Sequence, residues 1–322
     1  MPLLSINFPS WLGPEIFPGL PIRWYGLMYI FAFATAYIMY RRQVKERNFP
    51  MSDDNLSSLF FWGILGLLIG ARLFSTIIYD ASDIYRRQPW LIFWPFRNGQ
   101  FTGLQGMSYH GGAFGGLLAV IIYAKVKRYS FREIGDMFAA AIPLGFTWGR
   151  LGNFANAELY GRVTTVPWGM IFPNAGDLPR HPSQLYQAFF EGIVLWAIIW
   201  FFRNRKPFKG FLVGLYFLGY GVIRFIIEYF RQPDAHLGFP IELGKSTPAA
   251  EYALSHPLLS FSTGQILCFF MITFGIIWLI IASRMPNRDV IRVYDKIEQK
   301  PDNTEEARAE RNKRRKLRKK LR

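Results

Sequence analysis

The stretch FFMITFGIIWLII, residues 269–281, has no polar face when it is wound as a helix. With its neighbours it forms an apolar segment over Ser262–Ala282. About 20 mostly apolar residues are enough to cross the core of a bilayer. A soluble protein would have to bury this helix on every side. The stretch therefore predicts an α-helical membrane protein.

Six earlier segments have the same character, and charged residues, only 19% of the chain, cluster in short tracts between them. We expect spans near Ile22–Tyr40, Leu56–Tyr79, His110–Ala124, Ile134–Trp148, Gln184–Phe202 and Phe211–Phe230. The third and fourth of these are short, so we expect them to extend into the flanking sequence. The predicted fold class is an all-α polytopic membrane protein with about seven transmembrane helices.

Lysine and arginine residues indicate the orientation, because they are enriched in cytoplasmic loops. If the N-terminus is outside, the segments that face the cytoplasm hold 27 basic residues and the outer segments hold 9. We therefore expect the N-terminus outside and the C-terminus in the cytoplasm. This arrangement requires an odd number of spans, which agrees with seven.

The end of the chain is strongly basic and explains much of the net charge of +16. Nine of the twelve residues over 311–322 are lysine or arginine. We interpret residues 287–322 as a flexible cytoplasmic tail held near anionic lipid headgroups, and residues 1–286 as one membrane-embedded domain. The tail lacks the interleaved aromatic residues of a nucleic-acid-binding segment, so we expect no nucleic acid partner.

Cysteine and histidine give no sign of a metal site. The single cysteine, Cys268, lies in the middle of the last span and cannot form a disulfide within one chain. We expect it to fill space as a small apolar side chain. The four histidines lack the spacing of metal ligands. We expect no metal and no cofactor.

The residues most informative about function are polar ones in apolar surroundings, because a charge inside a bilayer is costly and usually faces a cavity. The first group, Met107–Gly116, places His110 ahead of an apolar helix whose glycines allow another helix or a ligand to come close. Histidine titrates near neutral pH and often serves as a general base. A hydrogen-bonded histidine at the membrane interface is the simpler interpretation.

A second group, Gly149–Arg162, follows the fourth span and contains two arginines, two asparagines and a glutamate. Arg150 and Asn153 lie at helical spacing, and a guanidinium group there can bind a phosphate through two hydrogen bonds. The amides can orient the rest of a polar headgroup. The alternative is an extramembrane loop with ordinary ion pairs, but the density of polar groups beside glycines favours a binding site.

A third group, Arg180–Gln187, precedes the fifth span. Ser183 can cap the helix whose first turn holds Gln184, because a serine oxygen can accept from the free backbone N–H groups of a helix start. Capping alone is sufficient to explain this group, so we interpret it as mainly structural.

A fourth group lies within the sixth span, where Tyr220, Arg224 and Glu228 follow one another at intervals of four residues. They form one polar stripe on an otherwise apolar helix. Arg224 and Glu228 can pair, which lowers the cost of burying either. A structural ion pair would not need the tyrosine on the same line. The stripe predicts a polar cavity in which Arg224 is a second phosphate-binding residue.

Together these groups resemble the phosphatidylglycerol–prolipoprotein diacylglyceryl transferase family over about residues 20–285. The segments that carry the resemblance are Arg23–Tyr29, His110–Gly112, Gly149–Arg162, His181–Tyr186 and Tyr220–Asp234. The sequence departs from the family at Ala157, where glycine is common, and at Gln187, where glutamate is common. The resemblance ends near Asn287.

The resemblance implies a reaction in the bacterial cytoplasmic (inner) membrane, at a site toward the outer face. The diacylglyceryl group of phosphatidylglycerol is transferred to the lipobox cysteine of a prolipoprotein, which forms a thioether and releases glycerol phosphate. A thiol is a poor nucleophile until it is deprotonated, and His110 is the expected base. Arg150 and Arg224 are expected to stabilise the leaving phosphate. The residues expected to bind phosphatidylglycerol are Arg150, Asn153, Tyr25, Tyr220, Gly161, Glu158 and Glu228.

Two other classes of protein share some of these features. A transporter of an anionic lipid or solute also places arginines along a buried path, but the sequence has no inverted repeat and no matching pair of broken helices. An intramembrane protease needs a Ser–His pair or paired aspartates within its spans. Ser108 is too close in sequence to His110 to be an evident partner.

Overall fold

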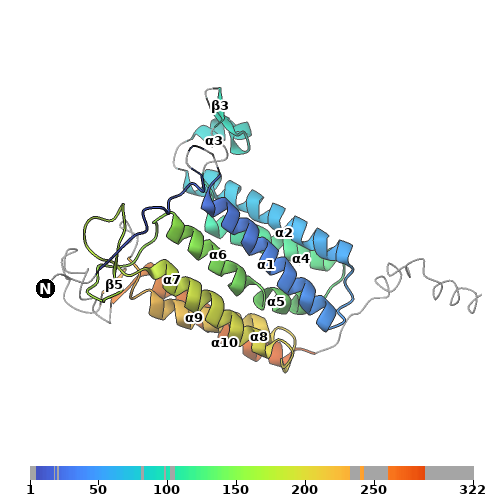
Figure 1. Ribbon diagram of the computed structural model, residues 1–322. Coiled ribbons are helices and arrows are strands. Elements are labelled where there is room, and N and C mark those ends of the chain that lie inside the picture. The colour runs from blue at the N-terminus through green and yellow to red at the C-terminus, as the bar shows by residue number, and fades with distance from the viewer. Residues whose placement is uncertain are drawn as a thin grey trace, which may run out of the picture. The chain divides into compact units, whose positions relative to one another are not determined.

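The chain is mostly helical (Figure 1), and the structure, a computed structural model, describes residues 5–17, 19, 22–80, 83–97, 99–101, 106–232, 240–242 and 260–286. The helices within these ranges that are long and apolar enough to cross a membrane are Asp53–Tyr79, Tyr109–Val126, Ser183–Phe202 and Thr263–Arg284. A fifth apolar helix, Phe211–Ile227, is shorter. The tail predicted over 287–322 lies outside the described residues.

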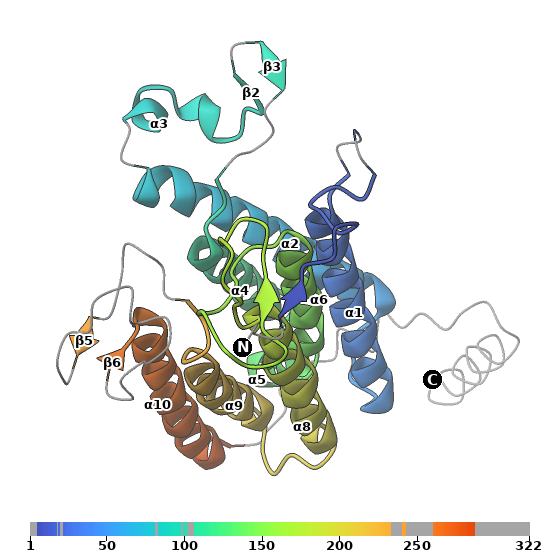
Figure 2. The same cartoon turned by 60° about the vertical axis from the view of Figure 1, so that its left-hand side comes forward.

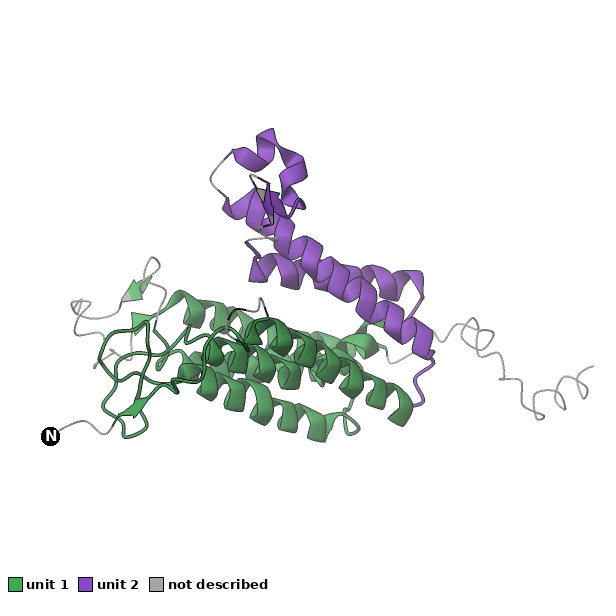
Figure 3. Cartoon of the chain, turned by 45° about the horizontal axis from the view of Figure 1, so that its top comes forward, with its two compact units in different colours: residues 1–47, 130–288 green, residues 48–129, 289–322 purple. Residues whose placement is uncertain are grey.

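The chain divides into two compact units, which Figure 3 colours green and purple. Unit 1 comprises residues 1–47 and 130–288, and unit 2 comprises residues 48–129 and 289–322. The helices of unit 1 are α1 (Trp24–Glu46), α5 (Phe131–Ala139), α6 (Ile142–Ala155), α7 (Ser183–Gln187), the π-helical segment η3 (Ala188–Val194), α8 (Leu195–Phe202), α9 (Phe211–Ile227) and α10 (Thr263–Arg284).

Short strands in unit 1 connect loops that are distant in sequence. They are β1 (Ile6–Asn7), which pairs in parallel with β4 (Met170–Ile171), and β5 (Ile241–Glu242), which pairs antiparallel with β6 (Ser260–Phe261). The elements of unit 2 are α2 (Asp53–Leu73), the π-helical segment η1 (Phe74–Tyr79), α3 (Ile84–Arg87), the 3₁₀ helix η2 (Pro89–Ile92), the paired strands β2 (Phe96–Arg97) and β3 (Gln100–Phe101), and α4 (Tyr109–Val126).

One expected span is not a single helix. The segment predicted over 134–148 consists of α5, which ends at Ala139, and α6, which begins at Ile142. Pro143 explains the break, because it has no N–H to donate and its ring would clash with the carbonyl of residue 139 in a continuous helix. Proline is well tolerated in a first turn, which is its place in α6.

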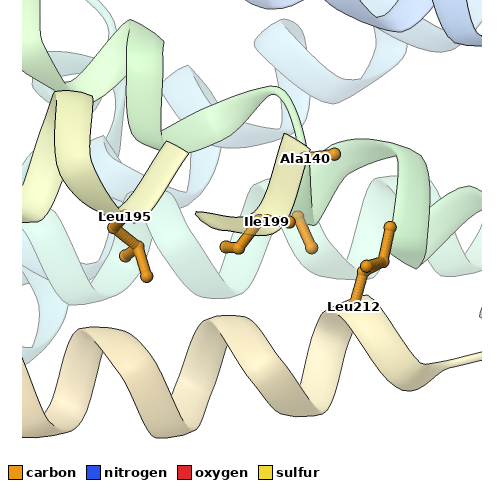
Figure 4. Close-up of a cluster of buried hydrophobic side chains, with 5 residues drawn as sticks. Ala140, Leu195, Ile199 and Leu212 are labelled. Carbon is orange, nitrogen blue, oxygen red and sulfur yellow. The ribbon is translucent and has the colours of Figure 1, made fainter. Parts of the chain in front are cut away.

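Unit 1 is held together by helix pairs, among them α9 with α10 and α1 with α6 (Figure 2). A cluster of buried apolar side chains joins α8 and α9 to the α5–α6 connection, and Figure 4 labels Ala140, Leu195, Ile199 and Leu212 in it. The last three are at most 1% exposed. Full burial of a leucine or isoleucine contributes about 1.5–3 kcal/mol, so this cluster fixes α9 relative to α8.

A buried carboxylate, that of Asp136 on α5, holds the start of α9. Its two oxygens accept hydrogen bonds from the backbone N–H groups of Gly210 (2.9 Å), Leu212 (2.9 Å) and Val213 (3.2 Å). Lys206 donates to it as well, at 2.9 Å. The first N–H groups of a helix have no partner within the helix, and Asp136 supplies one. We call Asp136 and these donors the Asp136 cluster.

Glycines form the contact between α2 and α4 in unit 2. Gly66 and Gly70 on α2 face Gly111 and Gly115 on α4 so closely that a Cβ atom on any of them would strike backbone of the opposite helix. At Gly66 and Gly111 it would strike a neighbouring side chain as well. Small residues at intervals of four let two helices approach in this way. The expectation that the glycines after His110 let another helix come close is confirmed at Gly111 and Gly115. We call this contact of four glycines the glycine seam.

The outer faces of the long helices are apolar. On α10, Phe269 and Phe270 are each 61% exposed, and Ile276 and Ile277 are nearly half exposed. Exposed apolar surface of this extent is unfavourable in water and suits a lipid environment. With the spanning lengths of four helices, it identifies a multi-pass membrane protein.

Candidate active site

The end of α6 carries a short network of polar side chains. Arg150 donates from Nη1 to the side-chain oxygen of Asn153 (3.2 Å), and Asn153 donates to Oε1 of Glu158 (2.8 Å). Asn153 is buried, whereas Glu158 is exposed. The chain turns back after α6 because Ala157 and Leu159 adopt the left-handed conformation, with φ of 51° and 56°. This turn brings the Glu158 carboxylate onto the helix that it follows.

An aromatic ring joins this network to α9. The guanidinium of Arg150 lies 4.6 Å from the ring centroid of Phe146, one turn earlier on α6. The ring of Tyr220 on α9 packs edge-on against the same ring, with the centroids 5.9 Å apart. The ring of Phe146 therefore contacts both the cation of Arg150 and the ring of Tyr220.

The polar stripe of α9 contains the predicted ion pair. Arg224 Nη2 lies 2.8 Å from Oε2 of Glu228, one turn further along the helix. The structure adds a second carboxylate that sequence reasoning missed: Glu191 Oε1 lies 3.3 Å from Arg224 Nη1. A single acidic residue within the apolar run Ala188–Phe202 was the available signal.

Glu228 connects the stripe to two further segments. Its Oε1 lies 3.3 Å from Nη1 of Arg231 and accepts a hydrogen bond from the hydroxyl of Ser262 (3.2 Å). Ser262 also caps α10, since its oxygen accepts from the backbone N–H of Gln265. The carboxylate thus holds the end of α9 against the start of α10.

The charges gathered here do not cancel. Arg150 and Arg224 lie within electrostatic range of each other, and Glu191 and Arg231 lie within range of Arg150. With Glu228, these five side chains form what we call the Arg224 cluster. Its three arginines outnumber its two glutamates, and Arg162 also lies within electrostatic range of Glu228, so the described charges around Arg224 are net positive and favour an anion.

Tyr25 and Gly161, two other predicted site residues, contact different parts of unit 1. The ring of Tyr25 on α1 packs beside Gly152, where a Cβ atom would lie 3.1 Å from the ring. Gly161 donates its N–H to the carbonyl of His181 (2.8 Å), and a Cβ there would lie 2.5 Å from the carbonyl oxygen of Phe230. Gly161 therefore permits a close backbone crossing beside the end of α9, as its type predicts.

The start of α7 differs from the prediction. Ser183 does not cap the helix but is its first residue, and its hydroxyl donates to the carbonyl of Leu159 (3.0 Å). Gln184 donates from its amide to the carbonyl of Glu158 (2.6 Å). Pro182 occupies the cap position, so the serine oxygen faces the preceding loop rather than the helix N–H groups. Both side chains hold the loop that carries Glu158.

His110 belongs to unit 2 and is the second residue of α4. Its side chain is exposed, and its Nδ1 lies 3.1 Å from the hydroxyl of Tyr79 at the end of η1. Ser108 is the N-cap of α4, where its oxygen accepts from the N–H of Gly111 (3.2 Å). The other predicted site residues belong to unit 1. In the part of the chain that the structure describes, no three His, Cys, Asp or Glu residues gather as metal ligands.

Comparison with known proteins assigns the chain to a family. Residues 14–281 match the family described as prolipoprotein diacylglyceryl transferase. A phosphatidylglycerol–prolipoprotein diacylglyceryl transferase of Treponema denticola is 52% identical over 84% of this chain and 92% of its own length. The proteins of the same name from Treponema pallidum and Chlorobaculum tepidum are 47% and 43% identical over 90% and 88% of this chain, and over 99% and 95% of their own lengths. The chain therefore belongs to the prolipoprotein diacylglyceryl transferase family.

Proposed function

We propose that this chain transfers the diacylglyceryl group of phosphatidylglycerol to the lipobox cysteine of prolipoproteins. The sulfur forms a bond to the glyceryl carbon as the bond between that carbon and the phosphate oxygen breaks, so that glycerol phosphate leaves with the electron pair. The Arg224 cluster is the observation that carries the proposal, because its net positive charge suits an anionic phosphodiester in a site shielded from water.

The arginines of the cluster have different tasks in this mechanism. Arg150 contacts an amide oxygen and an aromatic ring, and its remaining N–H groups can bind the phosphate as a fork. Arg224 contributes a charge that two carboxylates already orient. Fixed charges of this kind stabilise a leaving phosphate without reorganising during the reaction.

The remaining site residues orient the lipid headgroup. Tyr25, Tyr220 and Asn153 offer hydrogen-bonding groups, and Glu158 holds the amide of Asn153. Gly161 keeps the loop after α6 close to the end of α9, and Glu228 keeps Arg224 in place.

His110 takes the proton of the cysteine thiol. In the tautomer whose Nδ1–H donates to the hydroxyl of Tyr79, 3.1 Å away, Nε2 is free to accept that proton. We expect His110→Asn to lower the transfer rate by about a hundredfold or more. Its residual rate should rise with pH as the thiol ionises unaided, and a rate independent of pH would contradict the role of a base.

We propose the inner membrane as the location, with seven spans, an outside N-terminus and the site toward the outer face. The asymmetry of 27 to 9 basic residues supports this topology. A reporter fused after Arg231 should be outside, and one fused after Arg203 inside. We also propose that residues 1–286 are the catalytic domain, so that deletion of 295–322 leaves transfer largely intact.

One assay tests the proposed reaction directly. Purified protein is incubated with phosphatidylglycerol and a lipobox peptide, and the peptide is analysed by mass spectrometry for an added diacylglyceryl mass. A peptide with serine in place of the lipobox cysteine is the control and should stay unmodified. No adduct from well-folded protein would rule out the transferase and favour a transporter, which forms no thioether.

A further inference from the structure

Glu191 occupies an unusual place for a carboxylate. Its side chain is fully buried in the middle of η3, the π-helical segment between α7 and α8. Arg224 Nη1 is its hydrogen-bond partner at 3.3 Å, and its second oxygen, Oε2, has no hydrogen-bond partner among the described residues. No backbone N–H of the described residues donates to the Glu191 carboxylate, so Glu191 does not hold a helix end in the way that Asp136 does.

The position of Glu191 follows from the π-helix. A π-helical turn contains an extra residue compared with an α-helical one, and such turns are frequent at functional sites. Next to Glu191 in η3, Gly192 packs against Thr147 of α6, and a Cβ atom at Gly192 would meet the side chain of Thr147. The close contact with α6 lets η3 carry Glu191 to the guanidinium of Arg224.

Arg224 is therefore held from two helices. Glu228, one turn along α9, contacts Nη2, and Glu191, from η3, contacts Nη1. Glu228 alone would leave the guanidinium plane free to rotate, because one carboxylate restrains one edge of the fork. The second carboxylate on a different nitrogen fixes the plane.

We infer that Glu191 is a positioning residue for the proposed transfer reaction: it holds the Arg224 guanidinium in the plane from which that cation stabilises the leaving phosphate. This inference rests on the proposed function. Glu191 acts through Arg224, and the position of that charge matters most in the transition state. Loss of Glu191 should therefore lower the rate of transfer more than the affinity for phosphatidylglycerol.

The test begins with Glu191→Gln, which keeps the shape of the side chain and removes its charge. We expect kcat for thioether formation to fall about tenfold, while KM for phosphatidylglycerol changes less than about twofold. Asp136→Asn is the matched control, a buried carboxylate of unit 1 outside the site. It should lower thermal stability and leave kcat per folded molecule unchanged.

A double-mutant cycle with Arg224→Gln separates positioning from a structural role. If Glu191 acts through Arg224, the double variant Glu191→Gln/Arg224→Gln should be no slower than Arg224→Gln alone, since the partner is already gone. Rates are compared per folded molecule, because Arg224→Gln leaves the buried Glu191 carboxylate without its partner, whereas the double variant removes both charges.

The outcomes distinguish this inference from the proposed function. Full activity in Glu191→Gln, or losses that multiply in the double variant, would overturn the positioning role while the transferase remains. A parent protein that forms no adduct would instead overturn the proposed function itself.

Discussion

The Asp136 cluster and the Arg224 cluster both bury carboxylates in unit 1, but against different partners. Asp136 accepts hydrogen bonds from three backbone N–H groups and from Lys206. Glu191 and Glu228 contact arginine side chains instead, and in Glu191 one oxygen is left without a partner in the described part of the chain. The first carboxylate holds backbone, and the other two hold a cation.

The difference teaches how to interpret a buried charge in a membrane protein. Both clusters contain buried charges, and a charge in a bilayer is costly wherever it lies. Burial therefore does not distinguish the roles of the two clusters. The donors decide the role: a carboxylate saturated by a helix start stabilises the fold, and a carboxylate that orients a guanidinium leaves charge available for a ligand. The two clusters should therefore respond in opposite ways to substitution.

The largest expected effect is on stability and concerns Asp136→Ala. Removal of this carboxylate leaves the first N–H groups of α9 without their buried acceptor, which costs about 1–3 kcal/mol of unfolding free energy for each unsatisfied group, whereas Lys206 keeps its ion pair with Glu133. Thermal unfolding in detergent measures the loss. Thioether formation per folded molecule should stay within about twofold of the parent. A fall in activity larger than the fall in folded protein would erase the distinction between the two clusters.

The next effect is on activity and concerns Arg150→Lys and Arg224→Lys. An ammonium group keeps the charge but cannot reproduce the planar fork, so each variant should lower thioether formation by at least about tenfold, or roughly 1.4 kcal/mol of transition-state stabilisation. Arg203→Lys, whose guanidinium packs 4.2 Å from the ring centroid of Trp200, is the matched control outside the site. Full activity in both site variants would leave the transferase standing and remove the phosphate-binding mechanism.

A smaller effect tests the loop between α6 and Glu158. Ala157 adopts a φ of 51°, a conformation that costs a residue with a Cβ roughly 1–2 kcal/mol. Ala157→Gly relieves this strain, but it increases unfolded-state entropy and removes a buried methyl group that packs with Met170 and Phe172. Its stability should therefore stay within about 0.5 kcal/mol of the parent. Ala155→Gly, at the last position of α6, removes a buried methyl group with no strain to relieve and should lower stability by about 0.8 kcal/mol. An equal loss in both variants would show that the turn at Ala157 is not strained.

The smallest effect concerns pH and His181, outside the spans. Burial, followed by the charge of Arg162, lowers the pKa of His181 below its usual 6.5. The unfolded chain then binds the proton more readily than the folded chain, so stability is complete above about pH 6.5 and decreases as the pH falls toward the lowered pKa. Thermal unfolding of parent and His181→Asn should diverge only below that pH. Parallel pH profiles would mean that His181 is not protected from protonation.

Local spacing predicted part of this site, and tertiary contacts decided the rest. Arg224 and Glu228 are one helical turn apart, so their pairing follows from sequence alone. Glu191 reaches Arg224 from a different helix, 33 positions away, and no periodicity predicts such a contact. The cap expected at Ser183 was wrong because Pro182 takes that position and the serine hydroxyl binds the preceding loop.

The helices, too, were predicted where they depend on local sequence and missed where they depend on distant residues. Apolar length predicted most of the long helices, since it depends on composition within one segment. The break between α5 and α6 was missed, although Pro143 within an otherwise apolar run was a local signal for it. The placement of Asp136 against the start of α9 depends on residues about 75 positions apart, which sequence patterns do not connect.

The glycine seam also determines the order in which the chain can assemble. Inside lipid the hydrophobic effect does not favour one helix over an acyl chain, so association depends on packing and on weak Cα–H···O contacts between backbones. Gly70 and Gly111 allow such contacts between α2 and α4 without any other part of the protein. We expect this helical hairpin to form as soon as α4 is inserted, so that a ribosome still synthesising α9 and α10 is already attached to a completed pair.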